Sequence, residues 1–413
     1  MLAPPLCWRV GTHTSLMSHW LILASLWSYF ATGAKRETRP LRGLVLLNCT
    51  LLAISSGVHP YIGAMLAGLI LAAYLRAYLL ALVSLRNALA LILSIPAILV
   101  AGWWFFGYFS GTIQSEGDWL GYGKFALNLN SFLDPQTFSL FLDPLRIPSR
   151  QEGGFAYLGI GLMALILLNS RYLLTRLIAG FRTPSLIPLC VHCLAYLVFA
   201  LGNNIYFGDE VVFRYPLPKF VSEIFDIFRA SNRFVWPVFY VIMATTLAGS
   251  FRFVDRRSYQ VLLCIALVIQ FTDLIPLHSG RRSLVHRDPK LDSPLLSPEW
   301  NDLAPRHDKL LLFPSSICKK GRSAIAPFPL FARIAAEQGL KLNDFHFARP
   351  SKKIRHLHCD LMPDAVRAGK LDRRAAYVLH QKSYRKTIAR IRKDKNATHT
   401  CSRIDRFTLC VRR

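Results

Sequence analysis

A long segment between two apolar runs, residues 109–154, carries acidic side chains of a kind that takes part in chemistry. Glu116 and Asp118 lie two residues apart, a spacing that lets both carboxylates reach one cation from a loop. A carboxylate in such a loop can also act as a general base that removes a proton from a hydroxyl group. The alternative is that both are solvated loop acids, and the sequence leaves the two interpretations open.

A second polar segment, residues 203–233, carries the adjacent acids Asp209 and Glu210. They are catalytic candidates for the same reason and have the same alternative. The sequence leaves the cofactor unknown, and a divalent cation is the one that carboxylates of this kind would hold.

Cations in and near this second segment suit a phosphate group. Arg229 and Arg233 lie four residues apart, so on one helix face they would clamp a single phosphate, and Lys219 precedes them. His59, at a turn before Pro60, completes the predicted phosphate-binding set. The alternative is that the arginines extend toward lipid head groups and that the histidine is satisfied at an interface.

The elements that must position these residues are apolar. Hydrophobic residues make up 53% of the 413 residues and charged residues only 18%, below the roughly one quarter that is usual in soluble proteins. A membrane helix needs about 20 mostly apolar residues. We count about eight candidate spans, at residues 17–33, 42–58, 60–80, 87–108, 155–175, 185–202, 234–250 and 259–276.

Basic residues fall in every second connection between these spans, and short connections rich in Lys and Arg stay in the cytoplasm. The connections concerned are residues 35–42, 76–86, 171–182 and 252–257. The segments 109–154 and 203–233 then lie outside, and residues 1–16 form an external N-terminal stub. The transmembrane domain covers residues 17–276. An outward N-terminus without a signal peptide predicts that the natural protein begins further upstream.

Residues 277–413 have a different composition. From residue 281 onward, 30 Lys and Arg stand against 12 Asp and Glu, and no apolar run is long enough to span a bilayer. Helix and strand patterns alternate, with strands at 310–313, 376–380 and 407–411 and helices at 329–339 and 382–395. The sequence therefore predicts an α-helical polytopic membrane protein of about eight transmembrane helices, with a small basic α/β domain outside the cytoplasm.

An external position permits disulfides in this domain, and Cys401 with Cys410 is the predicted local pair. It also excludes nucleic acid as the natural partner. A basic surface beside a membrane more readily meets lipid phosphates or acidic glycans.

Four stretches of the chain carry a resemblance. They are HTSLMSHWLILASLWSYF (13–30), GYGKFALNLNSFLDP (121–135), EGGFAYLGIGLMALILL (152–168) and FRASNRFVWPVFY (228–240). Together they resemble a family of bacterial multipass membrane proteins with a domain of unknown function, which is placed with the GT-C type of glycosyltransferase. The resemblance implies an enzyme of the bacterial inner membrane that transfers a sugar from a polyprenyl-phosphate carrier to an envelope glycan or lipid acceptor at the outer face.

In GT-C enzymes the catalytic acid usually lies in the first external loop. That loop would be reduced here to residues 1–16, which contain no acid. Either Glu116, Asp118, Asp209 or Glu210 takes the place of that acid, or the chain is an incomplete enzyme. The second hypothesis is a non-catalytic transporter or an assembly factor for envelope polysaccharide. Transporters tend to have repeated halves. The sequence shows no clear internal repeat, which favours the enzyme over a transporter.

Overall fold

The computed structural model describes residues 3–33, 39–109, 122–148, 151–253, 255–285, 295–318, 328–344, 352–394 and 396–413. The chain divides into two compact units. We call the described residues up to 285 the helical unit and those from 295 onward the C-terminal unit. The candidate acids Glu116 and Asp118 lie outside the described residues.

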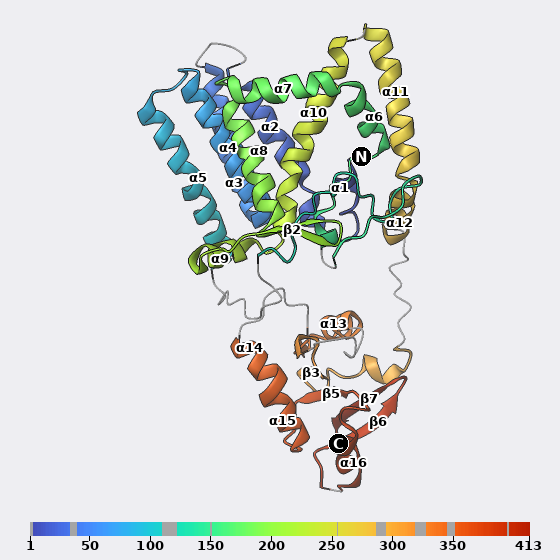
Figure 1. The fold of residues 1–413 in the computed structure, drawn as a ribbon. Helices are drawn as coiled ribbons and strands as arrows, with labels where there is room; N and C mark the ends of the chain where they lie inside the picture. The colour runs from blue at the N-terminus through green and yellow to red at the C-terminus, as the bar shows by residue number, and fades with distance from the viewer. Residues whose placement is uncertain are drawn as a thin grey trace. The chain divides into compact units, whose positions relative to one another are not determined.

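The helical unit has a helix at each position where the sequence predicts a span (Figure 1). These helices are α2 (His19–Ala31), α3 (Arg39–Val58), α4 (Pro60–Leu79), α5 (Leu85–Phe105), α6 (Ile160–Leu168), α8 (Ile187–Leu201), α10 (Val235–Phe253) and α11 (Arg256–Asp273). Shorter elements join them: α1 (Pro4–Cys7), α7 (Ser170–Arg182), α9 (Lys219–Phe225), α12 (Ile275–Val285), the hairpin of β1 (Asn204–Phe207) and β2 (Glu210–Arg214), and the 3-10 turns η1 (Thr14–Met17), η2 (Gln151–Gly154), η3 (Asp226–Phe228) and η4 (Ser231–Phe234).

Length and composition let four helices among the described residues cross a membrane, at Leu41–Val58, Pro60–Leu79, Leu85–Phe105 and Ser231–Phe251. The number rises to six if α6 with α7 and α11 with α12, which are bent pairs, each count as one span. The 15 residues of α8 extend only about 22 Å at the rise of an α-helix, less than the thickness of a hydrocarbon core. The prediction of several membrane helices is therefore confirmed, and the count of eight stays a prediction.

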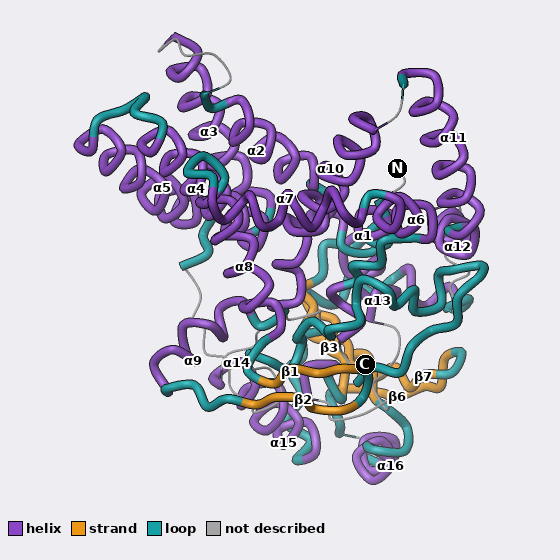
Figure 2. Tube along the Cα trace, turned by 45° about the horizontal axis from the view of Figure 1, so that its top comes forward, coloured by secondary structure: helices purple, strands orange, loops and turns teal. Residues whose placement is uncertain are grey.

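The predicted span 155–175 is divided between two helices. α6 ends at Asn169, whose side-chain amide donates hydrogen bonds to the carbonyl oxygen of Leu165 and to the hydroxyl of Ser250, both at 2.7 Å. α7 then turns by 77° and runs across the ends of other helices in both views (Figure 1, Figure 2). It carries three arginines and several exposed apolar side chains, a composition typical of a helix that lies in a membrane interface.

The two ends of the helical unit differ in what they carry. One end, which we call the loop end, holds α1, α9, α12, the hairpin β1–β2 and the segment 122–158, at the lower side of this unit in Figure 1. His59, between α3 and α4, belongs to the same end, because the charges of Arg9, His13 and Arg233 act on it. The opposite end holds α7 and the connection from α10 to α11. Segments that are far apart in the sequence therefore meet at the loop end.

Helix α4 is the centre of the helical unit and packs against α2, α3, α5 and α8. Close approach depends on small residues, as is usual between membrane helices. A Cβ atom on Gly68 would collide with the hydroxyl oxygen of Tyr196 on α8. That hydroxyl donates a hydrogen bond of 2.5 Å to the carbonyl oxygen of Met65, so the two helices are fastened where they approach closely.

The C-terminal unit is built on a five-stranded sheet with the strand order β4-β3-β5-β7-β6. The strands are β3 (Lys309–Phe313), β4 (Lys341–Leu342), β5 (Ala375–Leu379), β6 (His399–Ile404) and β7 (Phe407–Arg412). β3 pairs in parallel with β4 and β5, while β7 is antiparallel to both β5 and β6. The predicted small α/β region is confirmed, and β4 and β6 are additions to it.

Helices cover both faces of this sheet. α13 (Phe328–Glu337) packs its apolar side on Leu310 and Leu312 of β3. α15 (Met362–Arg367) and α16 (Arg385–Lys393) pack on Leu311 and Phe313, which point to the other face because side chains alternate along a strand.

Two disulfides lie in the C-terminal unit. Cys401 and Cys410 are bonded across β6 and β7, where they are opposite each other in the strand register. Cys318 and Cys359 form the second disulfide, which joins the turn after β3 to the helical segment before β5. The predicted local pair is therefore confirmed, and the second pair joins cysteines whose partners the sequence leaves open.

Candidate functional site

Arg9 is a deeply buried arginine of the loop end, with 2% of its surface exposed. It follows α1, and its guanidinium lies over the rings of Trp8, at 4.2 Å, and Trp236, at 5.3 Å. One terminal nitrogen donates a hydrogen bond to the carbonyl oxygen of Gly153. The Nε atom is buried and has no hydrogen-bond partner among the described residues, so this guanidinium keeps an unused donor.

Arg233 reaches the same end from η4, just before α10. Its guanidinium lies 4.9 Å from the centre of the Tyr61 ring. The Tyr61 hydroxyl in turn accepts a hydrogen bond of 2.9 Å from the backbone N–H of Ala230, which holds the turn before η4 against α4. In the described part of the chain the Nε atom of Arg233 is also buried without a partner.

His59 caps the N-terminus of α4, and its Nδ1 atom accepts a hydrogen bond of 3.2 Å from the N–H of Tyr61. A neutral imidazole that accepts at Nδ1 carries its proton at Nε2. His59 therefore adds another N–H donor.

Charge couples these three side chains, which we call the cationic cluster: Arg9, His59 and Arg233. Burial, followed by the positive charges of Arg233 and Arg281, lowers the pKa of Arg9 to about 9, so the guanidinium stays protonated at neutral pH. Burial, followed by the charges of Arg233, His13 and Arg9, lowers the pKa of His59 to about 4. The buried guanidinium of Arg9 and the half-buried guanidinium of Arg233 thus lie near each other.

Neither Arg9 nor Arg233 forms an ion pair within the described part of the chain. An uncompensated buried charge costs several kcal/mol. The arrangement therefore favours an anion with several acceptor oxygens, and a phosphate group has that chemistry.

The pKa of His59 leads to a prediction about stability. The folded protein holds this ring neutral down to about pH 4, whereas the unfolded chain protonates it near pH 6.5. The unfolded state therefore binds more protons between these values, and the free energy of unfolding falls as the pH drops from 6.5 to 4, by up to about 3 kcal/mol. Thermal unfolding of His59→Gln in this window should show a weaker pH dependence than the wild type. Equal slopes would contradict the buried neutral state.

The structure also places the remaining predicted residues, and the charge of Arg229 acts on Arg233. Arg229 and Arg233 are not on one helix face, because Ala230 has a non-helical backbone between η3 and η4. Lys219 is exposed at the start of α9. Asp209 and Glu210 are exposed at the turn of the β1–β2 hairpin.

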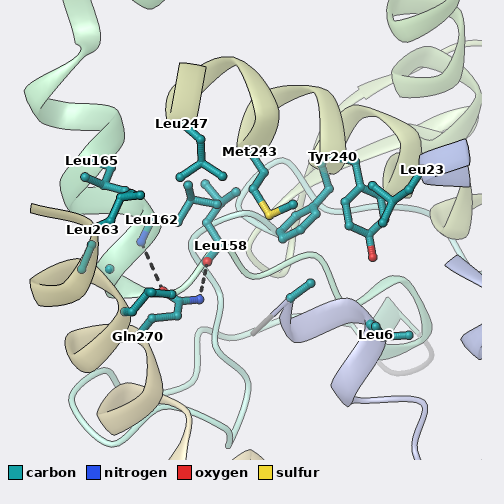
Figure 3. A pocket seen from close by; sticks show the side chains of 15 residues that line it. Leu6, Leu23, Leu158, Leu162, Leu165, Tyr240, Met243, Leu247, Leu263 and Gln270 are labelled. Carbon is teal, nitrogen blue, oxygen red and sulfur yellow. Dashed lines mark hydrogen bonds between the residues drawn. The ribbon is translucent and has the colours of Figure 1, made fainter. Parts of the chain in front are cut away.

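The helical unit also holds an apolar cavity of about 300 Å³, whose lining does not include Arg9, His59 or Arg233. α1, α2, α6, α10 and α11 form its walls (Figure 3). The side chains labelled in Figure 3 are Leu6, Leu23, Leu158, Leu162, Leu165, Tyr240, Met243, Leu247, Leu263 and Gln270. Gln270 closes the wall between α6 and α11, because its amide donates to the carbonyl oxygen of Leu158 at 2.9 Å and accepts from the N–H of Leu162 at 3.2 Å.

A chain of aromatic contacts joins the cavity to the cationic cluster. The hydroxyl of Tyr240, which lines the cavity, lies 2.7 Å from Nδ1 of His19. The His19 ring packs 4.5 Å from Trp236, and Arg9 lies over the same indole. Leu6 lines the cavity only three residues before Arg9. The site therefore combines a charged head region with an apolar chamber.

No three His, Cys, Asp or Glu side chains converge into a metal-binding group within the described ranges. Two described acids of the helical unit serve structural roles instead. Asp134 accepts from the N–H groups of Gln136 and Leu145. Asp273 fixes the segment before α6 to α11 through hydrogen bonds from Tyr157 and the N–H of Ile160.

Comparison with known families gives two matches that together cover most of the chain. Residues 1–275 match the family described as "Domain of unknown function (DUF6311)". Residues 299–412 match the one described as "DUF6311 C-terminal domain". No curated protein and no solved structure matches the chain.

Proposed function

Since the chain belongs to the DUF6311 family, which is described as a domain of unknown function, we propose a function from the site itself. The helical unit binds an amphiphile with a phosphate head group and a long apolar chain. The observation that carries this proposal is the pair of guanidinium groups of Arg9, which is buried, and Arg233, which is half-buried. Their Nε atoms are both buried without a partner, and neither group forms an ion pair with a carboxylate in the described residues. A phosphate would accept hydrogen bonds from their free Nε–H groups and offset their charge.

The cavity supports the same ligand class. Its lining is almost entirely aliphatic and aromatic, so it suits hydrocarbon, and each buried methylene group contributes about 0.8 kcal/mol. Among its walls is α10, which is long and apolar enough to cross a membrane, and we propose that a lipid enters the cavity from the bilayer. A water-soluble phosphate compound would leave the cavity unused.

We further propose that this ligand is a polyprenyl phosphate carrying a sugar, and that the protein is a glycosyltransferase of the bacterial inner membrane with eight spans and its loop end outside. In the reaction, an acceptor hydroxyl oxygen bonds to the anomeric carbon as the bond from that carbon to the phosphate oxygen breaks. The phosphate leaves with the electron pair and stays on the carrier. Arg9 and Arg233 would stabilise the charge that develops on it.

A carboxylate must take the proton of the acceptor hydroxyl. Asp209 and Glu210 are the described candidates, and Glu116 and Asp118 remain candidates outside the described residues. Because Asp209 and Glu210 are exposed on a hairpin turn, a second function is favoured by the same geometry. The protein would then bind the lipid-linked sugar without reacting it, as a transporter or an assembly factor for envelope polysaccharide does.

The test uses the purified full chain in nanodiscs with polyprenyl phosphates that carry radiolabelled glucose, mannose or arabinose, together with an envelope extract as acceptor. Loss of label from the carrier, abolished by Arg233→Ala and kept in Arg214→Ala, supports transfer. Arg214 is a suitable control because it is an exposed arginine of the same end, on β2. Binding without loss of label supports the non-catalytic function. A protein that neither binds nor turns over any of the three carriers contradicts both.

A further inference from the structure

The C-terminal unit has its own candidate site, at the carboxyl end of β3. The parallel strands are ordered β4-β3-β5, so the chain leaves β3 toward one side for β4 and then crosses back to the other side for β5. The helices of the two crossovers cover opposite faces of the sheet. This point of reversal, beyond the carboxyl ends of the strands, is where open α/β sheets bind ligands.

Asp344 lies at this point and is fully buried, with 0% of its surface exposed. Its Oδ1 atom accepts hydrogen bonds from the N–H of Ser316 at 3.0 Å and from the hydroxyls of Ser315 and Ser316. Its Oδ2 atom has no partner among the residues that the structure describes. The preceding residue, Asn343, bonds to both the N–H and the carbonyl of Leu312, so the backbone that carries Asp344 is fixed to β3.

His358 belongs to the helical segment before β5, and the disulfide from its neighbour Cys359 to Cys318 ties this segment to the turn whose Ser316 donates to Asp344. Burial lowers the pKa of His358, and the negative charge of Asp344 opposes that shift, so the two groups are electrostatically coupled. The Nδ1 atom of His358 is buried and, like Oδ2 of Asp344, finds no partner in the described ranges. Each group therefore keeps one unused polar atom.

The backbone around His358 has an unusual conformation and is cross-linked by a disulfide. His358 lies in a π-helical turn, Leu357–Leu361, between α14 (Lys352–His356) and α15. Such turns occur often at functional sites. The disulfide from Cys359 to Cys318 ties this turn to the residues that follow Ser316. The fold therefore places a histidine near a buried carboxylate and fastens the two segments covalently.

The unused atoms define the chemistry of a ligand. Oδ2 of Asp344 only accepts hydrogen bonds, whereas an imidazole nitrogen either donates or accepts. A hydroxyl group satisfies both, because it donates to the carboxylate and accepts from the ring N–H. A phosphate ligand is disfavoured by the buried negative charge, and a cationic ligand is disfavoured by the strongly basic unit around it. No metal-binding group of three side chains forms among the described residues.

We propose that Asp344 and His358 form a binding site for a neutral saccharide, recognised through its hydroxyl groups. Ser316, which donates to Asp344, and His358 are themselves partly exposed, so the ligand would reach the carboxylate from their side. The proposal concerns the C-terminal unit alone and does not depend on the lipid site of the helical unit.

The test measures saturation-transfer NMR between the full chain in nanodiscs and a panel of neutral sugars: glucose, galactose, mannose, rhamnose and N-acetylglucosamine. Inorganic phosphate and ethanolamine serve as competitors. At least one sugar should receive saturation, and Asp344→Asn and His358→Phe should each weaken its binding by at least tenfold. Because Asp344→Asn removes a buried charge, the circular dichroism of both variants is compared with that of the wild type, and His358→Phe preserves an aromatic ring.

The chain offers matched controls on the same helical segment. His356 and Asp360 form an exposed pair with a distance of 2.9 Å between Nδ1 and Oδ2, so His356→Gln and Asp360→Asn should leave sugar binding unchanged. The proposal is overturned if no sugar receives saturation from the wild type, if binding persists in folded Asp344→Asn, or if phosphate or ethanolamine displaces the sugar.

Discussion

Replacing Arg9 by methionine should weaken binding of a polyprenyl phosphate at least tenfold while leaving the protein as stable as the wild type or more so. A hydrogen bond to a charged group contributes about 1.5–3 kcal/mol, which corresponds to a factor of ten or more in affinity. In the free protein, however, the same guanidinium is buried beside Arg233 and Arg281. Methionine keeps much of the apolar contact with Trp8 and Trp236 and removes the repulsion, and apolar replacement of buried charges is often neutral or stabilising.

The opposed changes in binding and stability distinguish a ligand site from a structural arginine. Affinity is measured with labelled polyprenyl phosphate in nanodiscs, and stability is measured by thermal unfolding. Arg233→Met should behave in the same way, and the double variant should lose detectable binding. Arg214→Met is the control, because this exposed arginine lies on the hairpin. If Arg9→Met lowered the unfolding temperature by several degrees and left binding unchanged, the cationic cluster would be structural.

The sequence predicts the helices well because a membrane helix needs only a long apolar run, which is a local property. The same reasoning fails at residues 155–175, where composition continues to look apolar and Asn169 ends the helix through its bond to Ser250. That partner lies 81 residues further along the chain. The edge strand β6 is not predicted either, because its sequence, HTCSRI, is mostly polar and its pairing with β7 decides its conformation.

The candidate site could be predicted only in part. The sequence predicts Arg233 from its spacing to Arg229 and His59 from its place at a turn. The spacing argument is wrong, since Ala230 breaks the helix, yet the structure brings Arg233 and His59 together. The sequence does not predict Arg9. Its one local signal is a charge that follows the apolar residues Cys7 and Trp8, and its burial depends on Gly153 and Trp236 from distant parts of the sequence. Burial of a charge arises from tertiary packing, so composition and periodicity do not show it.

The acidic residues also show that the sequence does not reveal which polar side chains are buried. Asp209 and Glu210 attracted attention as a pair, and the structure places them exposed on a hairpin turn. Asp273, a single acid near the end of a predicted span, is instead fully buried and holds the segment that continues from Gly153. The place of an acid in the sequence therefore does not show whether it anchors a segment, because tertiary packing decides which acids are buried.

Replacing Asp273 by alanine should lower the free energy of unfolding of the helical unit by about 3–5 kcal/mol, because buried donors would lose their acceptor. The side chain accepts from the Tyr157 hydroxyl at 2.8 Å, from the N–H of Ile160 at 3.1 Å and from the Ser139 hydroxyl. Asp255→Ala is the matched control. It removes an aspartate from the opposite end of the same helix, where the side chain is an exposed N-cap, and its effect on thermal unfolding should be far smaller.

Asp273→Ala should also affect the cationic cluster indirectly. Asp273 fastens residues 157–160, and these continue the segment whose Gly153 accepts a hydrogen bond from Arg9. Loosening this segment removes the acceptor that orients Arg9, so Asp273→Ala should also weaken polyprenyl-phosphate binding at temperatures where the variant is still folded. Asp273→Asn keeps one acceptor oxygen, so it should lose less stability and less polyprenyl-phosphate binding than Asp273→Ala. If Asp273→Ala and Asp255→Ala unfolded at the same temperature, the buried carboxylate would not be the anchor of this segment, and the position of Arg9 would have to depend on its stacking between Trp8 and Trp236 alone.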